Sequence, residues 1–318
     1  MDHLIDHIRD NSSRLDPLPT GEIMRNTGVS PVGIHQDDTH RRDACAPFPP
    51  LLGMRAVVFD IYGTLFISGS GDISLAKKED RSPAIIASLE TAGFKVTNPD
   101  ANWSASFLQS VDDFRQQRMD QGIEFPEVRI QEVWEAFIEQ AMSDDWLEAA
   151  SACPERAKRV EWAIVDHECR VNPCWPMPNL DETLRWIEDR ELKLGIVSNA
   201  QFYTPLLFPG LMESTIEDYG FNPDYSVWSY IEREGKPSQN LYRKLKDNLT
   251  KDNIVPGEVL YVGNDLRNDI WPAQRCGFRT ALFAGDARSL RWREDDESCK
   301  HIRPDFVITD LTQIKQIV

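Results

Sequence analysis

The sequence predicts an α/β fold, in which a doubly wound parallel sheet carries a second, mostly helical cap domain. Short apolar runs typical of buried strands recur along the chain, and helical patterns separate several of them. A long helix-rich segment lies between the first and second runs. Strands that alternate with helices imply right-handed crossovers, and such crossovers build a parallel sheet.

The first strand is predicted over residues 55–60, where RAVVFD is rich in valine and is followed by the turn-forming IYGT. We therefore expect this strand to end at Asp60. Further strands are predicted at 192–199, 225–230, 258–265, 278–285 and 305–310. Helical patterns at 180–190, 238–249 and 271–277 each precede one of these strands.

The segment after the first strand shows little strand signal. Four helices are predicted there, at 82–93, 102–122, 129–143 and 154–170. An insertion at this place would lie above the carboxyl ends of the strands, where sites form in α/β sheets. We expect an α/β core over 51–70 and 180–318, with a helical cap over 71–179.

Residues 1–50 differ in composition from the rest of the chain. They hold six of the twenty prolines and four of the six histidines. No sustained helical or alternating pattern follows the opening MDHLIDHIRD, so we expect an irregular N-terminal arm.

Composition excludes several classes of function. The 318 residues are 41% hydrophobic, enough for a substantial core, and their net charge is −17. So acidic a chain repels phosphate backbones and anionic lipid, which argues against nucleic-acid and membrane partners. No apolar run is long enough to span a bilayer, and no secretory signal is visible. The six cysteines form no C-x-x-C pair. We expect a cytoplasmic protein, monomeric or homodimeric, with a small-molecule substrate.

Polar residues stand at the predicted carboxyl ends of the strands, which meet at one crevice in a parallel sheet. They are Asp60, Tyr62 and Thr64 after the first strand, Ser198 and Asn199 after the second, Lys236 after the third, and Asn264, Asp265 and Asp269 after the fourth.

These residue types suit a covalent hydrolase. Asp60 could attack phosphorus or carbon to give an aspartyl ester that water then cleaves. Thr64 and Ser198 could hold substrate oxygens, and Lys236 would supply a fixed cation beside the nucleophile. Each residue alone has an ordinary structural alternative, such as a strand-end cap or a surface lysine.

Four ordered motifs resemble the haloacid dehalogenase (HAD) superfamily. They are VVFDIYGTL (57–65), GIVSN (195–199), GKPSQNLY (235–242) and LYVGNDLRND (260–269). The resemblance implies a HAD-like Rossmannoid core, a cap inserted after the first strand, and the same roles for Asp60, Ser198 and Lys236. It covers roughly 55–67 and 190–310 and says little about residues 1–50.

Two features point to different substrates. Most phosphatases of this superfamily carry a second Asp two residues after the nucleophile, but this chain has Tyr62, which resembles the 2-haloacid dehalogenases. The fourth motif, with Asp265, resembles Mg²⁺-binding phosphatases instead. Three carboxylates against Lys236 leave excess negative charge, which a bound Mg²⁺ would cancel.

We therefore expect a Mg²⁺-dependent phosphohydrolase acting on a small phosphorylated metabolite. The expected metal ligands are the Asp60 and Asp265 carboxylates and the Tyr62 backbone carbonyl, with Asn264 and Asp269 in support. One alternative is a metal-independent 2-haloacid dehalogenase, and another is an inactive binding scaffold. On the cap, Arg115 and Arg118 could reach an anionic substrate, although a solvated helix face is the more common role of such arginines.

Overall fold

The computed structural model describes residues 1–21, 50–70, 80–148 and 156–318. Its centre is a six-stranded sheet in the order β10-β9-β8-β1-β6-β7, and every neighbouring pair is parallel. The strands are β1 (Ala56–Phe59), β6 (Lys193–Ser198), β7 (Phe221–Trp228), β8 (Val259–Gly263), β9 (Arg279–Phe283) and β10 (Phe306–Ile308). This confirms the predicted doubly wound parallel sheet, although β7 begins four residues before its expected start.

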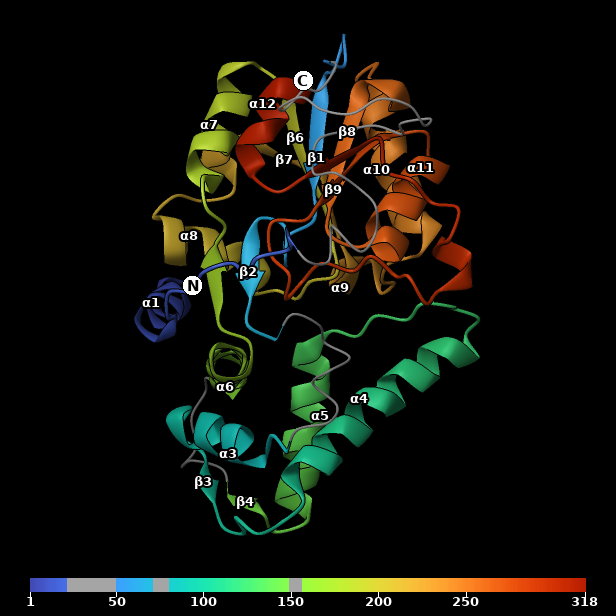
Figure 1. The fold of residues 1–318 in the computed structure, drawn as a ribbon. Helices are drawn as coiled ribbons and strands as arrows, with labels where there is room; N and C mark the ends of the chain where they lie inside the picture. Colours follow the sequence, from blue (N-terminus) through green and yellow to red (C-terminus); the bar gives the residue numbers. More distant parts are fainter. Residues whose placement is uncertain (22–49, 71–79, 149–155) are drawn as a thin grey trace.

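Helices cover both faces of this sheet (Figure 1). One face packs on α7 (Leu180–Asp189), α8 (Leu207–Met212) and α12 (Ile314–Ile317). The other packs on α10 (Gln239–Lys251) and α11 (Trp271–Arg275), and the short α9 (Ser229–Glu232) follows β7. Strand β1 shows why helices must pack on both faces of the sheet. Val57 and Phe59 belong to one apolar cluster and Ala56 and Val58 to the other, because successive side chains point to opposite faces.

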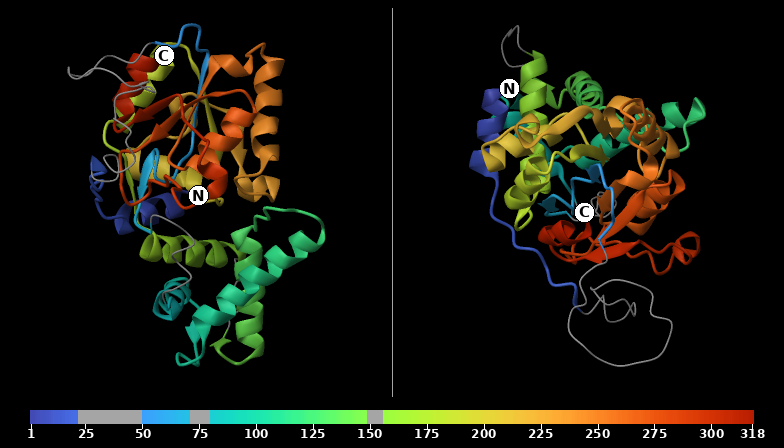
Figure 2. Two further views of the ribbon diagram at one scale, coloured as in Figure 1. Left: turned by 45° about the vertical axis from the view of Figure 1, so that its right-hand side comes forward. Right: turned by 90° about the horizontal axis from the view of Figure 1, so that it is seen from above.

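The helical segment lies at one end of the sheet (Figures 1 and 2). It contains α3 (Ser82–Thr91), α4 (Trp103–Asp120), α5 (Ile130–Ser143) and α6 (Arg156–Val171), each close to its predicted range. Aromatic side chains such as Trp103, Trp134 and Phe137 fill its interior. We call α3 to α6 the cap.

Short strands accompany the cap helices. Strand β2 (Phe66–Ser68) pairs with β5 (Cys174–Pro176), and this ribbon leads the chain out of the sheet and back. A two-residue pair, β3 (Lys95–Val96) and β4 (Leu147–Glu148), closes the far side of the cap. The ribbon lies next to the boundaries at 70/71 and 179/180 that we propose for the cap.

The expected irregular arm is wrong for its first residues, because Asp2–Asn11 form helix α1. This helix packs on both the cap helix α6 and the core helix α8. His7 Nε2 lies 2.9 Å from Asp166 Oδ1 on α6, and His3 stacks on Trp162. Partners within the fold stabilise this short helix, which would be marginal alone. Of the rest of the arm, residues 22–49 lie outside the described residues.

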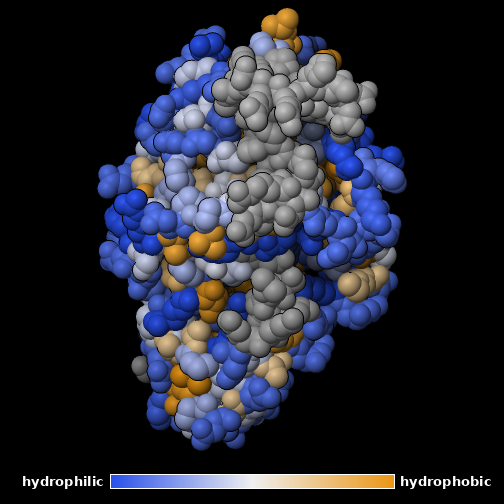
Figure 3. Space-filling model, in the orientation of Figure 1, coloured by the Kyte–Doolittle hydropathy of each residue, from blue (hydrophilic) through white to orange (hydrophobic). Residues whose placement is uncertain are grey.

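The surface is largely polar on the side seen in Figure 3, with apolar residues scattered through it. This agrees with an apolar interior that gathers in three buried clusters. Among the described residues, no helix has the length and apolar character required to cross a membrane.

Candidate active site

The predicted site residues converge at the carboxyl ends of three adjacent strands. Asp60 follows β1, Ser198 ends β6, and Asn264 follows β8. Because β1 lies between β6 and β8, these ends meet at one point of the sheet. Lys236 joins them from the loop before α10, and Asp269 from a π-helical turn at Leu266–Ile270.

A buried chain of charges forms the centre of the site. Lys236 Nζ lies 2.7 Å from Asp60 Oδ1 and 2.6 Å from Asp269 Oδ1. The Lys236 and Asp269 side chains are 3% and 1% exposed, and that of Asp60 is 11% exposed. The lysine therefore fixes the orientation of Asp60 through one carboxylate oxygen.

Electrostatics keep this lysine charged. Burial alone would lower the pKa of Lys236, but the Asp269 and Asp60 carboxylates outweigh burial and raise it. Burial raises the pKa of Asp269 to about 7 against the opposing effect of Lys236. Asp269 also accepts hydrogen bonds from the Tyr261 hydroxyl (3.0 Å) and the Asp265 backbone N–H (3.0 Å), which favour its ionised form.

Two asparagines brace the loops around Asp60. Asn199 Oδ1 accepts from the Lys236 backbone N–H at 2.8 Å. Asn264 Oδ1 accepts from Thr64 Oγ1 at 3.4 Å, and Asn264 Nδ2 donates to the Ser289 carbonyl at 2.6 Å. These contacts tie the strand ends to one another.

The structure buries Thr64 and Ser198, the two residues that the sequence predicts as holders of substrate oxygens. Both are fully buried, and neither lines the cavity above Asp60. Thr64 hydrogen-bonds Asn264, and Ser198 Oγ lies 3.5 Å from the Asn199 carbonyl. The Thr64 hydroxyl therefore connects the turn after β1 with the end of β8.

Asp265 has a role that the sequence did not indicate. Its Oδ1 accepts from the backbone N–H groups of Arg267 and Asn268, so it caps the turn that follows. Its two oxygens also accept from Arg293, at 3.1 Å for Nε and through a close contact of Nη2. With Arg293, the three site carboxylates face two cations rather than one, and the excess charge falls to one negative unit.

Tyr62 is poorly suited to proton exchange at neutral pH. Burial raises its pKa well above its ordinary value near 10, and the nearby Cys174 and Glu168 raise it further. Its hydroxyl lies 2.9 Å from Thr204 Oγ1. Tyr62 therefore does not replace the second aspartate as a base.

A cavity of about 650 Å³ lies between the cap and the sheet. Asp60, Lys236 and Asp265 contribute from the core, and Phe107, Trp134 and Glu168 contribute from the cap. Of the two cap arginines considered, Arg115 lines this cavity and Arg118 does not; Arg118 donates to Gln121 at 3.1 Å. The cavity combines a charged floor with a largely apolar roof.

Sequence reasoning missed Arg291, Arg293 and Ser289 on the loop after β9. The pair of arginines in RWREDDE was the available signal, but no strand or helix pattern accompanies it. It also missed Tyr261, whose place inside β8 predicts a core residue rather than a partner of Asp269.

The proposed metal ligands fit Mg²⁺ in chemical type, because two carboxylates and a carbonyl are hard oxygen donors. Metal binding at these ligands has one requirement, because Arg293 already donates hydrogen bonds to both carboxylate oxygens of Asp265. Within the described part of the chain, no group of three or more His, Cys, Asp or Glu side chains is arranged to hold a metal ion. The fit therefore requires Arg293 to withdraw.

Gly63 allows the loop after Asp60 to approach its neighbours. Its φ is +79°, and a Cβ at this position would lie 2.5 Å from Ser289 Cβ. We expect Gly63→Ala to lower the free energy of unfolding by about 1–3 kcal/mol and to lower hydrolysis, because the turn bearing Asp60 must shift. Chemical denaturation and initial-rate assays would measure both effects.

Gly53→Ala is the matched control, because Gly53 has a φ of +80° and no described atom lies within 4 Å of a Cβ built there. It should show the conformational cost alone, about 1 kcal/mol, and normal hydrolysis. Equal losses in the two variants would contradict the role assigned to the close approach at Gly63.

The structure places an aspartate beside a buried lysine at the carboxyl ends of a parallel α/β sheet. A family model for haloacid dehalogenase-like hydrolases matches residues 54–277, which is well over half of the chain. The protein belongs to this hydrolase family, as the four sequence motifs predicted.

Three comparisons illustrate the relationships. The chain is 32% identical over 89 residues to a phospholysine phosphohistidine inorganic pyrophosphate phosphatase of Danio rerio, covering 28% of this chain and 30% of that protein. It is 22% identical over 166 residues to a haloacid dehalogenase-like hydrolase domain-containing protein of Arabidopsis thaliana, covering 52% and 62%. The solved 2-haloacid dehalogenase of Pseudomonas syringae pv. Tomato DC3000 superposes with a TM-score of 0.48, at 17% identity, over 83% of this chain and 97% of that one.

The matches cover less than two thirds of each curated relative.

Proposed function

We propose that this hydrolase cleaves phosphate monoesters of small metabolites, with Asp60 as the covalent nucleophile and Mg²⁺ as cofactor. The observation that carries the proposal is the placement of Asp60 on the floor of the cavity, oriented by a buried Lys236 that Asp269 holds in turn. A carboxylate beside a fixed cation can approach a phosphate dianion that it would otherwise repel.

In the first step, Asp60 Oδ2 attacks phosphorus, the bond from phosphorus to the ester oxygen breaks, and the alcohol leaves with a proton taken from water. In the second, water attacks the aspartyl phosphate, releasing inorganic phosphate and restoring the carboxylate. Lys236 holds Asp60 Oδ1 throughout and balances charge on the transferring group. Mg²⁺, when bound by Asp60, Asp265 and the Tyr62 carbonyl, would supply further charge neutralisation.

The size of the cavity supports a substrate larger than a short haloacid. A volume of about 650 Å³ lies within the range of about 300–1,000 Å³ that is usual for small-molecule sites. A phosphorylated metabolite with an apolar portion would fill the charged floor and contact the roof formed by Phe107 and Trp134.

One observation favours metal-independent dehalogenation as a second candidate. Arg293 already neutralises Asp265, so the site has a cation of its own, and a halide needs no proton to leave. A 2-haloacid would present its carbon to Asp60 and its carboxylate to a cavity arginine such as Arg115.

One assay pair separates these candidates. With Mg²⁺, we expect phosphate release from p-nitrophenyl phosphate, and slower release from alkyl phosphates by about 10²–10⁴-fold because no second aspartate protonates the poor leaving group. EDTA should stop both reactions. Halide release from 2-halopropionate in EDTA, with no phosphate release from any ester, would replace the proposal with the second candidate.

A further inference from the structure

The loop at 290–297 is attached to the catalytic strand ends by its backbone. The Arg291 N–H donates to the Asn264 carbonyl at 2.9 Å, and the Leu266 N–H donates to the Arg291 carbonyl at 3.0 Å. These bonds bracket Asp265 on both sides, and Asp265 and Arg291 form a bridge between them. The loop therefore has a fixed register against the site.

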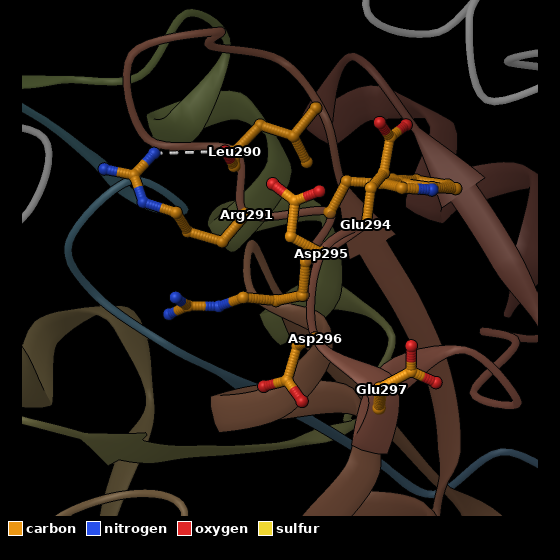
Figure 4. Close-up of a pocket in the computed structure, with 8 residues that line it drawn as sticks. Leu290, Arg291, Glu294, Asp295, Asp296 and Glu297 are labelled. Carbon is orange, nitrogen blue, oxygen red and sulfur yellow. Dashed lines mark hydrogen bonds between the residues drawn. The ribbon is translucent and has the colours of Figure 1, made fainter.

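This loop also separates two spaces. Arg291 and Arg293 line the cavity above Asp60, and the same arginines line an open depression of about 730 Å³ on the loop itself. In Figure 4 the Arg291 guanidinium turns back to the Leu290 carbonyl, at 3.0 Å, while the carboxylates of Glu294, Asp296 and Glu297 point away from it. Arg291 thus donates to two carbonyls of its own loop, those of Arg288 and Leu290.

The Arg293 side chain reaches Asp265, and its backbone has an unusual conformation. Its φ is +58°, a left-handed conformation that long side chains rarely adopt. From there the guanidinium meets both oxygens of Asp265 as a fork. The Asp265 side chain is 8% exposed and that of Arg293 is 29% exposed, so the pair is partly shielded from water.

The same carboxylate is the one that our proposed function assigns to a divalent cation. Asp265 Oδ1 already accepts from two backbone N–H groups and from Arg293 Nε. A guanidinium and a divalent cation would repel each other and compete for the remaining lone pairs. Arg293 must leave Asp265 for the metal to bind.

We propose that Arg293 is an internal counter-cation of Asp265 that competes with the divalent cation and sets the metal concentration at which the enzyme becomes loaded. The inference rests on Asp265 being a metal ligand, as the proposed function has it. Because an apparent dissociation constant rises as the open fraction falls, a pair closed in about 90–99% of molecules weakens metal binding about 10–100-fold.

The test uses Mn²⁺ as the probe and its electron paramagnetic resonance signal as the readout, without substrate. We expect Arg293→Gln to tighten Mn²⁺ binding about 10–100-fold. Arg293→Lys keeps the charge but loses the fork, and should lie between the wild type and Arg293→Gln. Asp265→Asn should weaken binding in either background.

Arg291→Gln is the matched control, because it removes the same charge from the same loop and cavity but leaves the contacts of Arg293 with Asp265 in place. It should change the Mn²⁺ affinity by less than about threefold. Equal tightening of Mn²⁺ binding in both glutamine variants would mean that the loss of any nearby positive charge has this effect. That result would overturn the inference. So would unchanged or weaker binding in Arg293→Gln, with circular dichroism showing a folded protein.

Failure of the inference and failure of the proposed function give different results. If neither the wild type nor Arg293→Gln binds Mn²⁺, the inference is overturned and the metal is removed from the proposed function. Phosphate release that depends on Asp60 would still stand in that case. If the wild type binds Mn²⁺ but releases no phosphate from any ester, the proposed function fails while the competition remains measurable.

Discussion

Replacing Asp60 by Asn is expected to lower phosphate release by about 10⁴–10⁶-fold while leaving the protein folded. The amide keeps the shape of the side chain but is a poor nucleophile, so the covalent step is lost. Asp60 lies at the end of β1, and its side chain touches Lys236 rather than the apolar core, so folding should survive. Initial rates with p-nitrophenyl phosphate and a thermal unfolding curve would measure the two effects.

Asp310→Asn is the control for this prediction. Asp310 also follows a strand of the sheet, β10, but it caps the next turn through the Thr312 N–H at 2.8 Å. Asn caps nearly as well as Asp, so both activity and stability should stay close to those of the wild type. If Asp60→Asn kept more than a hundredth of the activity, another nucleophile would have to be sought.

Replacing Lys236 by Met should affect both stability and rate. The ammonium group lies between two buried carboxylates, at 2.7 Å and 2.6 Å, and removing it leaves those charges uncompensated. Breaking a buried charge pair costs about 3–5 kcal/mol of unfolding free energy. Losing a fixed cation at the transferring group costs about 10²–10³-fold in kcat. Urea denaturation and steady-state kinetics would test each figure.

Lys244→Met, on the neighbouring helix α10, is the comparison. Lys244 pairs with Glu232 at 2.5 Å, but its side chain is 48% exposed, so the loss should stay below about 1 kcal/mol. Similar stability losses in the two variants would show that the Asp60-Lys236-Asp269 chain is not the stabilising element described above.

The fold was predictable because its signals are local. A run such as RAVVFD shows a buried strand without reference to the rest of the chain, and helices alternating with such runs determine the sheet type. The positions of Asp60 and Lys236 followed from the same reasoning, since parallel strands bring their carboxyl ends together. The two-residue strands β3 and β4 were not predicted, because a segment this short shows no alternation of apolar and polar residues.

The parts that were not predicted depend on contacts between distant segments. Arg293 reaches Asp265 across 28 residues, from a loop whose sequence resembles an ordinary solvated charge run. His7 lies in the segment expected to be irregular, yet it is buried against Asp166, 159 residues away. Neither pairing leaves a pattern in the sequence near either partner.

Helix α1 has a mechanical consequence for access to the cavity. It is wedged between α6 of the cap and α8 of the core, with Ile8 so close to Gly210 that a Cβ there would lie 2.9 Å from Ile8 Cγ2. If the cap moved away from the sheet, α1 would therefore have to lose its contacts with α6 or with α8, or α8 would have to move with the cap. Helix α1 is therefore a second connection between the cap and the core, in addition to the β2-β5 ribbon, and its contacts would resist their separation.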